Sequence, residues 1–178
     1  MAIYHLSAQA ISRATGRSAT AAAAYRAGEQ IHDQRSGQTH DYRRRKGVEH
    51  CEILSPAHAP DWTRDRARLW NQAEQTERRK DAQLCREIVV ALPAELDAEQ
   101  RLTLIRDFCQ NQFVRQGMIA DLAIHQPGRQ GDRRNHHAHI LLSLREIGPD
   151  GFGLKNRQWN QRDQLNQWRA AWADAANQ

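Results

Sequence analysis

Two segments in the last third of the chain, Ile124-His125 and His137–Leu142, constrain the fold most strongly. Polar and apolar residues alternate in the second segment as in a strand with one buried face, and a polar loop over residues 126–136 joins the two. Side chains two apart on a strand share a face, so His137 and His139 project together while the residues between and after them point to the buried side. If the two strands pair antiparallel, His125 comes alongside and completes a cluster of three imidazoles.

Such a cluster is typical of a metal site. Imidazole nitrogen is a common ligand of divalent metals, and three protein ligands leave coordination positions open for a substrate. The alternatives are a polar, solvated face of the sheet and a histidine run that packs on a helix, and the spacing by itself favours neither side. We hypothesise that His125, His137 and His139 bind one divalent ion.

The remaining sequence alternates irregularly between strand and helix patterns. The expected strands are residues 2–8, 84–92, 118–125 and 137–145, with a polar hairpin over 30–53, a loop over 149–156, and helices over 19–27, 60–81, 97–115 and from about 160 onward. Ser18 is a fitting N-cap for the alanine-rich helix and Gly28 a natural stop, while Asp97 with Gln100 resembles a capping arrangement.

This order of elements, without a Rossmann-type GxGxxG motif, predicts an α+β fold. Its sheet is mostly antiparallel, with helices packed on one face and the histidine site on the other. No internal repeat or linker interrupts the pattern, so residues 1–178 are predicted to form a single domain.

Length and composition limit the classes of protein. The 178 residues suffice for one well-packed domain, and they contain neither an apolar run long enough to span a membrane nor an N-terminal signal peptide. Cys51, Cys85 and Cys109 are odd in number and lack metal-type CxxC spacing. A reduced, cytoplasmic protein without membrane insertion is therefore expected.

Positive charge is concentrated near the N-terminus. Between Arg13 and Lys46 the sequence has eight Lys or Arg residues against three acids, a balance of +5 that equals the net charge of the whole chain. We call this stretch the basic block. A short charge run is often only a solvated loop, but the whole block is better explained by a bound nucleic acid, because each neutralised phosphate releases counterions. The predicted DNA contacts are Arg17, Arg26, Arg43, Arg44, Arg45 and Lys46.

Tyr25 lies inside the basic block, next to Arg26. A tyrosine on a short alanine helix is usually a half-buried packing residue. A catalytic role is favoured by the basic neighbours, by small alanines that allow close approach of another element, and by the candidate metal site. A metal neutralises the oxygens of a scissile phosphate, whereas a tyrosine oxygen needs a base or an electropositive environment to attack it. Tyr4 groups with apolar residues by strand alternation, and Tyr42 suits stacking on a base or a surface position.

Three ordered motifs together resemble a MobA/MobL-type conjugative relaxase of the HUH endonuclease superfamily. They are AIYHLSAQ at residues 2–9, GRSATAAAAYRAG at residues 16–28, and Ile124-His125 followed by NHHAHI at residues 135–140. The resemblance covers essentially the whole chain. It implies an enzyme that nicks one DNA strand at a plasmid origin of transfer and remains joined to the 5′ phosphate through Tyr25, with the three histidines holding the metal.

The resemblance also implies partners and a larger context. The expected partners are single-stranded plasmid DNA at the origin of transfer, accessory relaxosome proteins and a type IV secretion coupling protein in the bacterial cytoplasm. Family members commonly continue into helicase or primase regions, so this chain is expected to be the relaxase domain of a longer mobilisation protein.

Glu87 is carried over from the same resemblance, because residues 86–93 match an acidic strand motif of the family. Its role is either an orienting partner or the proton acceptor. The family often has a second acid where this chain has Val89, and a proline where it has His136, which strand alternation points away from the other histidines. His5 is a further candidate near the site, although a structural role is more common for such a histidine.

The identity of the metal depends on ligand chemistry and on supply. Mg²⁺ prefers oxygen ligands and keeps its waters, so three imidazoles suit Mn²⁺, Zn²⁺ or Ni²⁺ better, while availability in the cell also counts. We expect one divalent ion, Mn²⁺ or Mg²⁺ in the first place, with Zn²⁺ or Ni²⁺ as alternatives.

Two other functions remain open at this point. A rolling-circle replication initiator or a single-tyrosine transposase shares the metal and tyrosine chemistry, but its tyrosine usually follows the histidines, whereas Tyr25 precedes them. A non-catalytic nucleic-acid-binding domain uses the basic block alone and needs no aligned histidines. A cleavage assay with a Tyr25→Phe control separates it from an enzyme.

Overall fold

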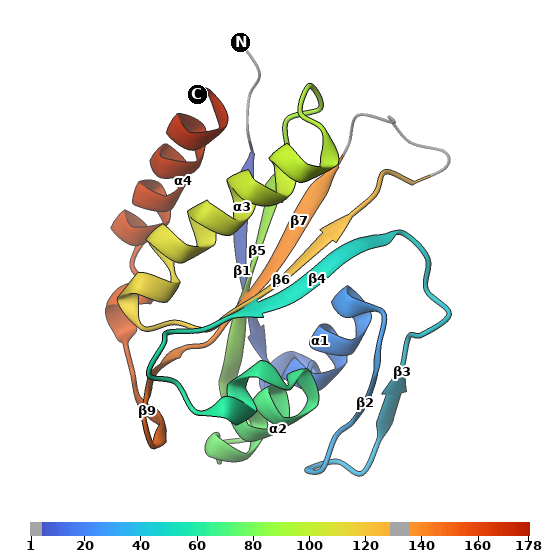
Figure 1. Ribbon diagram of the computed structural model, residues 1–178. Coiled ribbons are helices and arrows are strands. Elements are labelled where there is room, and N and C mark those ends of the chain that lie inside the picture. Colours follow the sequence, from blue (N-terminus) through green and yellow to red (C-terminus); the bar gives the residue numbers. More distant parts are fainter. Residues whose placement is uncertain (1–4, 129–135) are drawn as a thin grey trace.

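The computed structural model describes residues 5–128 and 136–178, and a five-stranded sheet forms the centre of this part of the chain (Figure 1). The strand order is β1-β5-β7-β6-β4, and every neighbouring pair runs antiparallel. The strands are β1 (Leu6–Ser12), β4 (Val48–Leu54), β5 (Gln83–Ala91), β6 (Ala120–His125) and β7 (His137–Leu142).

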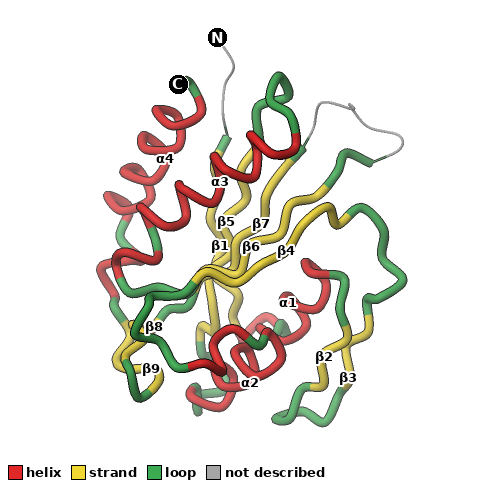
Figure 2. Tube along the Cα trace, viewed as in Figure 1, coloured by secondary structure: helices red, strands yellow, loops and turns green. Residues whose placement is uncertain are grey.

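Four α-helices in the described residues pack on this sheet, in two layers (Figure 2). They are α1 (Ala19–Ala27), α2 (Arg66–Thr76), α3 (Ala98–Gln112) and α4 (Arg162–Ala176). Helices α3 and α4 cover one face of the sheet. There Phe108 and Trp172 meet edge to face, with ring centroids 5.1 Å apart, in a core shared with Ile88 and Ile140. The alternation along β7 directs Ile140 into this core and the histidines to the opposite face.

The expectation of an α+β fold with an antiparallel sheet is confirmed, and the structure adds a second helical layer. Helices α1 and α2 lie on the histidine face, where Trp70 and the alanines of α1 pack against Cys85 and Leu141. The face that holds the histidines is therefore partly covered. No helix in the described ranges is long and apolar enough to cross a membrane.

Two short hairpins stand outside the central sheet. Strand β2 (Gln30–His32) pairs with β3 (Thr39–Asp41), and β8 (Arg145–Gly148) pairs with β9 (Gly151–Lys155). The expected loop over 149–156 therefore contains a strand. The expected hairpin over 30–53 ends at Asp41, after which the chain leaves to form β4 at the edge of the central sheet.

Other predicted boundaries shift by a few residues. The helix expected over 60–81 begins as a 3-10 turn (Asp61–Arg64), restarts after the N-cap Asp65 and ends at Thr76. The first strand begins at Leu6 and runs on to Ser12, while residues 2–4, with Tyr4, lie outside the described residues. Further 3-10 turns follow β1, α3 and β9 (Arg13–Thr15, Val114–Gln116, Arg157–Asn160).

Helix α1 begins and ends where its local sequence predicts. The Ser18 side chain accepts a hydrogen bond from the backbone N–H of Ala21, and Gly28 adopts a left-handed conformation (φ 68°) with its N–H on the Ala24 carbonyl. The alanines between these caps are small enough to let the helix lie close to the sheet. These two caps place Tyr25 and Arg26 in the last turn of the helix.

Two acidic side chains, one from α2 and one directly after α1, hold the ends of this helix. Glu74 of α2 accepts a hydrogen bond of 2.7 Å from the backbone N–H of Ala19, at the start of the helix. After its end, Glu29 forms an ion pair of 2.6 Å with Arg66, whose guanidinium also binds Asp121 of β6 at 2.8 Å. The Arg66–Asp121 pair is buried, so losing either partner would leave an uncompensated charge, and through Arg66 it anchors Glu29 and the end of α1 to the sheet.

Candidate active site

Three histidine side chains meet where β6 ends and β7 begins. His125 lies directly opposite His137 in the antiparallel register, and His139 follows two positions later on the same face. One ring nitrogen from each residue lies within 4.8 Å of the other two, and the ring centroids are 4.5 to 5.6 Å apart. The structure thus brings together the three ligands that strand alternation predicted.

The backbone of α1 orients the first of these rings. The Nε2 atom of His125 lies 2.9 Å from the carbonyl oxygen of Arg26. A carbonyl oxygen can only accept a hydrogen bond, so Nε2 carries the proton and Nδ1 carries the lone pair that a metal requires. The same contact places the last turn of α1, and with it Tyr25, beside the histidines.

Burial makes the cluster suitable for a cation. Burial is the main cause that lowers the pKa of His125 to about 4, and the charge of Arg45 contributes to it. Burial also lowers the pKa of His139. Both imidazoles are therefore neutral near pH 7, the form that ligates a metal. Three imidazoles gathered in this way are a donor set that fits a divalent ion.

Glu87 on β5 supports this ring. Its Oε1 atom is 3.6 Å from Nδ1 of His139, and its carboxylate makes two hydrogen bonds of 2.9 Å with the guanidinium of Arg26. Burial by itself raises the pKa of Glu87, but the contacts with His139 and Arg26 outweigh it and hold the pKa at about 2. A carboxylate that is ionised and paired in this way can orient a metal ligand, and it is a weak proton acceptor.

Tyr25 lies on the open side of the site, with 39% of its surface exposed. Its ring meets that of Tyr42 edge to face, with centroids 5.2 Å apart. The guanidinium carbon of Arg45 is 3.9 Å from the centre of the Tyr25 ring, and that of Arg26 is 5.1 Å away. The structure therefore places an accessible tyrosine among cations, one residue from the backbone group that contacts His125.

A cavity of about 530 Å³ adjoins this tyrosine, between α1 and the β2–β3 hairpin. Its lining includes Tyr25, Arg26 and Tyr42, and also Arg17 and Arg35. The side chains of Arg17 and Arg35 make no ion pair with any described residue. Sequence reasoning did not single out Arg35, although its place in the basic block is a signal for it.

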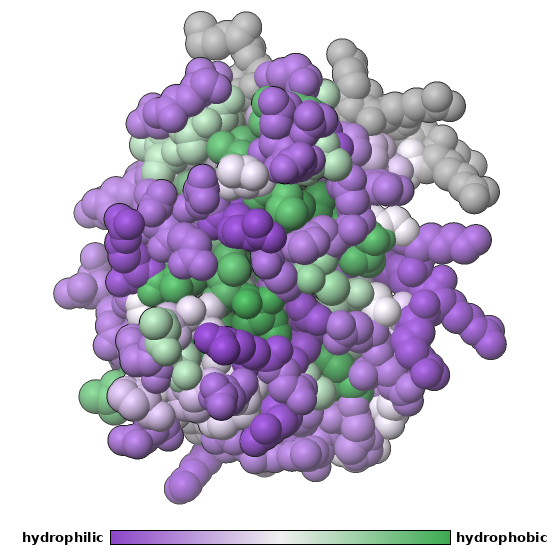
Figure 3. Space-filling model, in the orientation of Figure 1, coloured by the Kyte–Doolittle hydropathy of each residue, from purple (hydrophilic) through white to green (hydrophobic). Residues whose placement is uncertain are grey.

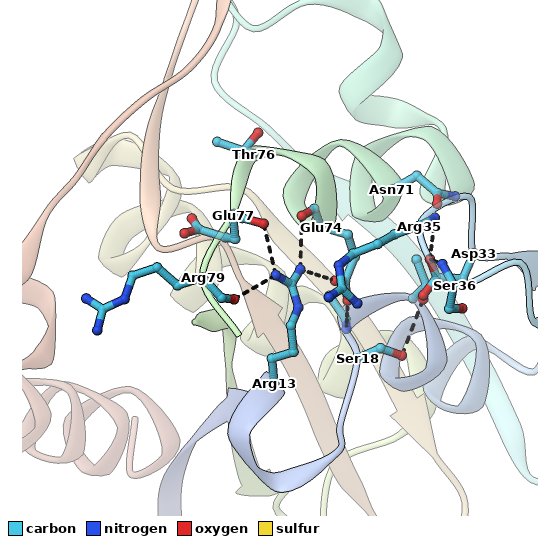
Figure 4. Close-up of polar contacts among 12 residues, drawn as sticks. Arg13, Ser18, Asp33, Arg35, Ser36, Asn71, Glu74, Thr76, Glu77 and Arg79 are labelled. Carbon is cyan, nitrogen blue, oxygen red and sulfur yellow. Dashed lines mark hydrogen bonds and ion pairs between the residues drawn. The ribbon is translucent and has the colours of Figure 1, made fainter. Parts of the chain in front are cut away.

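Arg13 also lines this cavity, but its guanidinium is already bound by other residues of the chain (Figure 4). Its guanidinium forms an ion pair of 2.7 Å with Glu74 and donates to the carbonyl oxygens of Glu77 and Arg79 at 2.9 and 3.0 Å. Arg13 therefore stabilises the fold and is not free to bind a ligand, although it carries the same charge as the other arginines of the basic block.

The residues predicted to contact DNA differ in their exposure and in their ion pairs. Arg26 is held by Glu87, and Arg43 forms an exposed pair of 2.8 Å with Asp41. Arg44 and Lys46 are exposed without an ion pair in the described part of the chain, and Arg45 turns inward to Tyr25. Hydrophilic side chains project where the chain passes from β3 to β4 (Figure 3).

The two other histidines considered above do not join the cluster. His5 is exposed ahead of β1, and its carbonyl oxygen accepts a hydrogen bond from Ala91. The carbonyl oxygen of His136 accepts from Leu92, and its ring lies outside the group of metal-ligating side chains found among the described residues.

Comparisons with known proteins identify the family. The model of the MobA/MobL family matches residues 17–178. Mobilization protein MobL of Acidithiobacillus ferridurans is 46% identical over 172 residues, which cover 85% of this chain and 45% of that protein. Conjugal transfer protein TraA of Rhizobium radiobacter is 42% identical over 166 residues, which cover 87% of this chain and 14% of that protein.

A solved structure agrees with these matches. The structure described as "Molecular Basis of Vancomycin Resistance Transfer in Staphylococcus aureus" aligns with a TM-score of 0.90 at 34% identity, over 99% of this chain and 91% of that one. The chain spans less than half the length of the MobL and TraA relatives. Because the family model covers most of the sequence and the fold is shared throughout, this chain belongs to the MobA/MobL family.

Proposed function

We propose that the chain is a relaxase domain, a metal-dependent endonuclease that nicks single-stranded DNA at a plasmid origin of transfer and keeps the cut strand on Tyr25. The observation that carries this proposal is the contact between the Arg26 carbonyl oxygen and Nε2 of His125 at 2.9 Å. It joins the helix that bears an accessible tyrosine to three clustered imidazoles. If the histidines had only a structural role, the position of an accessible tyrosine beside them would have no explanation.

The proposed reaction is a transesterification at phosphorus. The bond from the Tyr25 oxygen to phosphorus forms while the bond to the 3′ oxygen breaks. The phenolic proton leaves to solvent, to which Tyr25 is open, and the 3′ oxygen takes up a proton and departs as a hydroxyl. The products are a 5′-phosphotyrosine link and a free 3′-hydroxyl, and reversal of the same steps rejoins the strand.

His125, His137 and His139 are the residues that would hold a divalent ion, Mn²⁺ or Mg²⁺ in the first place and Zn²⁺ or Ni²⁺ as alternatives. When bound, such an ion supplies charge neutralisation at the non-bridging oxygens of the phosphate. The protein's own part is to keep His125 and His139 neutral by burial and to orient their rings. The Arg26 carbonyl oxygen orients His125, and Glu87, itself paired with Arg26, approaches His139.

The substrate and partners belong to the same proposal, which family membership supports. They are single-stranded DNA of an origin of transfer, accessory relaxosome proteins and a type IV secretion coupling protein. The bacterial cytoplasm is the compartment in which that DNA is found. The cavity beside Tyr25 and the exposed Arg44 and Lys46 supply the contacts to DNA phosphates.

The proposal is tested by covalent capture. The chain is incubated with labelled single-stranded fragments tiled across the DNA that flanks its gene, with and without a divalent metal. One fragment is expected to give a labelled protein band that survives denaturation and requires the metal. Full cleavage after EDTA treatment, or no adduct with any fragment, contradicts the proposal.

Replacing Glu87 by glutamine separates an orienting role from that of a proton acceptor. The amide keeps the shape but loses the charge that faces His139 and Arg26, so metal affinity is expected to fall about tenfold to a hundredfold while excess metal restores nicking. Titration calorimetry and nicking rates at rising metal concentration measure both effects. Absence of nicking at every metal concentration would assign Glu87 as the base.

The same variant has a predicted pH signature in the metal-free protein. The folded pKa of Glu87, about 2, lies below its ordinary value of 4.5, so the charged form stabilises the fold. This contribution is present above pH 4.5 and is lost as the pH falls toward 2. The difference in unfolding free energy between the natural chain and Glu87→Gln is therefore expected to shrink over that interval.

Neutralising exposed residues of Arg43–Lys46, which we call the basic run, is expected to weaken DNA binding in a salt-dependent way. If Arg44 and Lys46 each neutralise one phosphate of the single strand, replacing either by alanine reduces the magnitude of the slope of log K against log salt by about 0.7. Arg157→Ala, an exposed arginine that leads into α4, is the matched control. Equal slopes in all three variants would place the phosphate-binding residues elsewhere.

A further inference from the structure

The loop between β3 and β4 folds back onto the proposed site. The N–H of Arg45 donates to the Tyr42 carbonyl oxygen at 3.0 Å, which closes a turn, and the Gly47 carbonyl oxygen accepts from Gln126 at 2.8 Å. Gln126 directly follows His125. This loop is thus attached to the end of β6, and it carries Arg45 onto the last turn of α1.

Arg45 contacts Tyr25 in two ways, through its ring and through its backbone. Its guanidinium carbon lies 3.9 Å from the centre of the Tyr25 ring, within the range of a cation–π contact, and its Nη1 atom donates a hydrogen bond of 2.6 Å to the Tyr25 carbonyl oxygen. The ring of Tyr42 meets the Tyr25 ring edge to face at 5.2 Å. Backbone and ring of the same residue are therefore held by one planar group, with an aromatic neighbour beside it.

The neighbours of Arg45 in the basic run do not share this geometry. Arg43 pairs with Asp41, and Arg44 and Lys46 are exposed without an ion pair among the described residues. A guanidinium that stacks on a ring and donates in a fixed plane cannot be replaced by the point charge of a lysine. These four neighbouring cations thus do not share one environment. Arg45 is the one of the four that contacts Tyr25.

We infer that Arg45 is a positioning residue, which holds the Tyr25 ring in the orientation for attack on the scissile phosphate. The inference rests on the proposed role of Tyr25 as the nucleophile. A tyrosine that is 39% exposed has room to change its rotamer, whereas in-line attack needs the reacting atoms within about 3–3.5 Å of each other and aligned. The stacked guanidinium and the Tyr42 ring remove that freedom before DNA binds.

The test compares Arg45→Ala, Arg45→Lys and Arg44→Ala in the whole chain. For each variant the dissociation constant for DNA and the single-turnover nicking rate at saturating DNA are measured. Arg45→Lys keeps the charge, so its affinity is expected to stay within about threefold of the natural chain, while its rate falls about tenfold to a hundredfold, as for Arg45→Ala. Arg44→Ala is expected to act through affinity.

A second readout does not depend on catalysis. In protein labelled with ¹³C on the tyrosine rings, the Tyr25 signals, assigned with Tyr25→Phe, are expected to shift in Arg45→Lys without DNA. They are expected to keep their positions in Arg44→Ala and in the distant control Arg157→Ala. Equal melting temperatures confirm that the variants fold.

The outcomes separate this inference from the proposed function. If the natural chain nicks DNA and Arg45→Lys does so at the same rate, or if the Tyr25 signals do not move, the positioning role is overturned and Arg45 is a phosphate contact like Arg44. If the natural chain forms no adduct with any DNA fragment, the proposed function fails and the positioning role fails with it.

Discussion

Tyr25→Phe is expected to bind DNA like the natural chain and to form no covalent adduct. The substitution keeps the ring, so the contacts with Tyr42 and Arg45 persist and the end of α1 stays in place. It removes only the oxygen that attacks phosphorus in the proposed reaction. Nicking should fall to background while the dissociation constant for DNA and the melting temperature are unchanged, as measured with labelled oligonucleotide and by thermal unfolding.

The site of attachment gives the sharper form of this test. Proteolysis of the protein–DNA adduct followed by mass spectrometry should place the nucleotide on the peptide that contains Tyr25. Tyr42 is the competitor that the structure identifies, because the two rings are in contact. An adduct that persists in Tyr25→Phe and disappears in Tyr42→Phe would show that the nucleophile is Tyr42.

His137→Ala and His139→Ala are expected to abolish both metal binding and nicking. Each change removes one of three imidazoles whose nitrogens lie within 4.8 Å of one another. Loss of a partner that only orients a ligand costs about tenfold to a hundredfold in metal affinity, so loss of a ligand should cost more. Titration calorimetry with Mn²⁺ measures the binding, and the covalent adduct assay measures the activity.

His136 provides a matched control for this prediction. It neighbours His137 in sequence and lies outside the cluster of metal-ligating side chains found in the described part of the chain. His136→Ala should therefore retain the stoichiometry and affinity of metal binding. Metal binding that survives in His139→Ala, or is lost equally in His136→Ala, would show that the ion is held by other residues.

Much of the local structure could be read from the sequence, because its signals act over a few residues. Ser18 and Gly28 mark both ends of α1, and the Asp97–Gln100 capping box forms at α3 as predicted. Strand alternation puts His137 and His139 on one face and antiparallel pairing adds His125. The three candidate ligands were therefore identifiable before any tertiary contact was known.

Where local signals are weak or shared, the predictions were less accurate. Residues 151–155 carry two glycines and read as a loop, yet they form β9 because β8 offers them a partner. The basic run looks like one arm of a hairpin, but β4 leaves it for the edge of the central sheet beside β6. Pairing with a partner strand, which no short window of sequence contains, decided both cases.

The sequence by itself determined the caps of α1 and α3, the antiparallel α+β class and the identity of the clustered histidines, since each rests on patterns within short stretches of the chain. Only the tertiary structure decided how Arg26 reaches Glu87 and His125, 61 and 99 positions away, and why Arg45 differs from Arg44. Those contacts depend on the packing of α1 and the β3–β4 loop on the histidine face, because the direction and burial of a charged side chain are set by the elements that surround it.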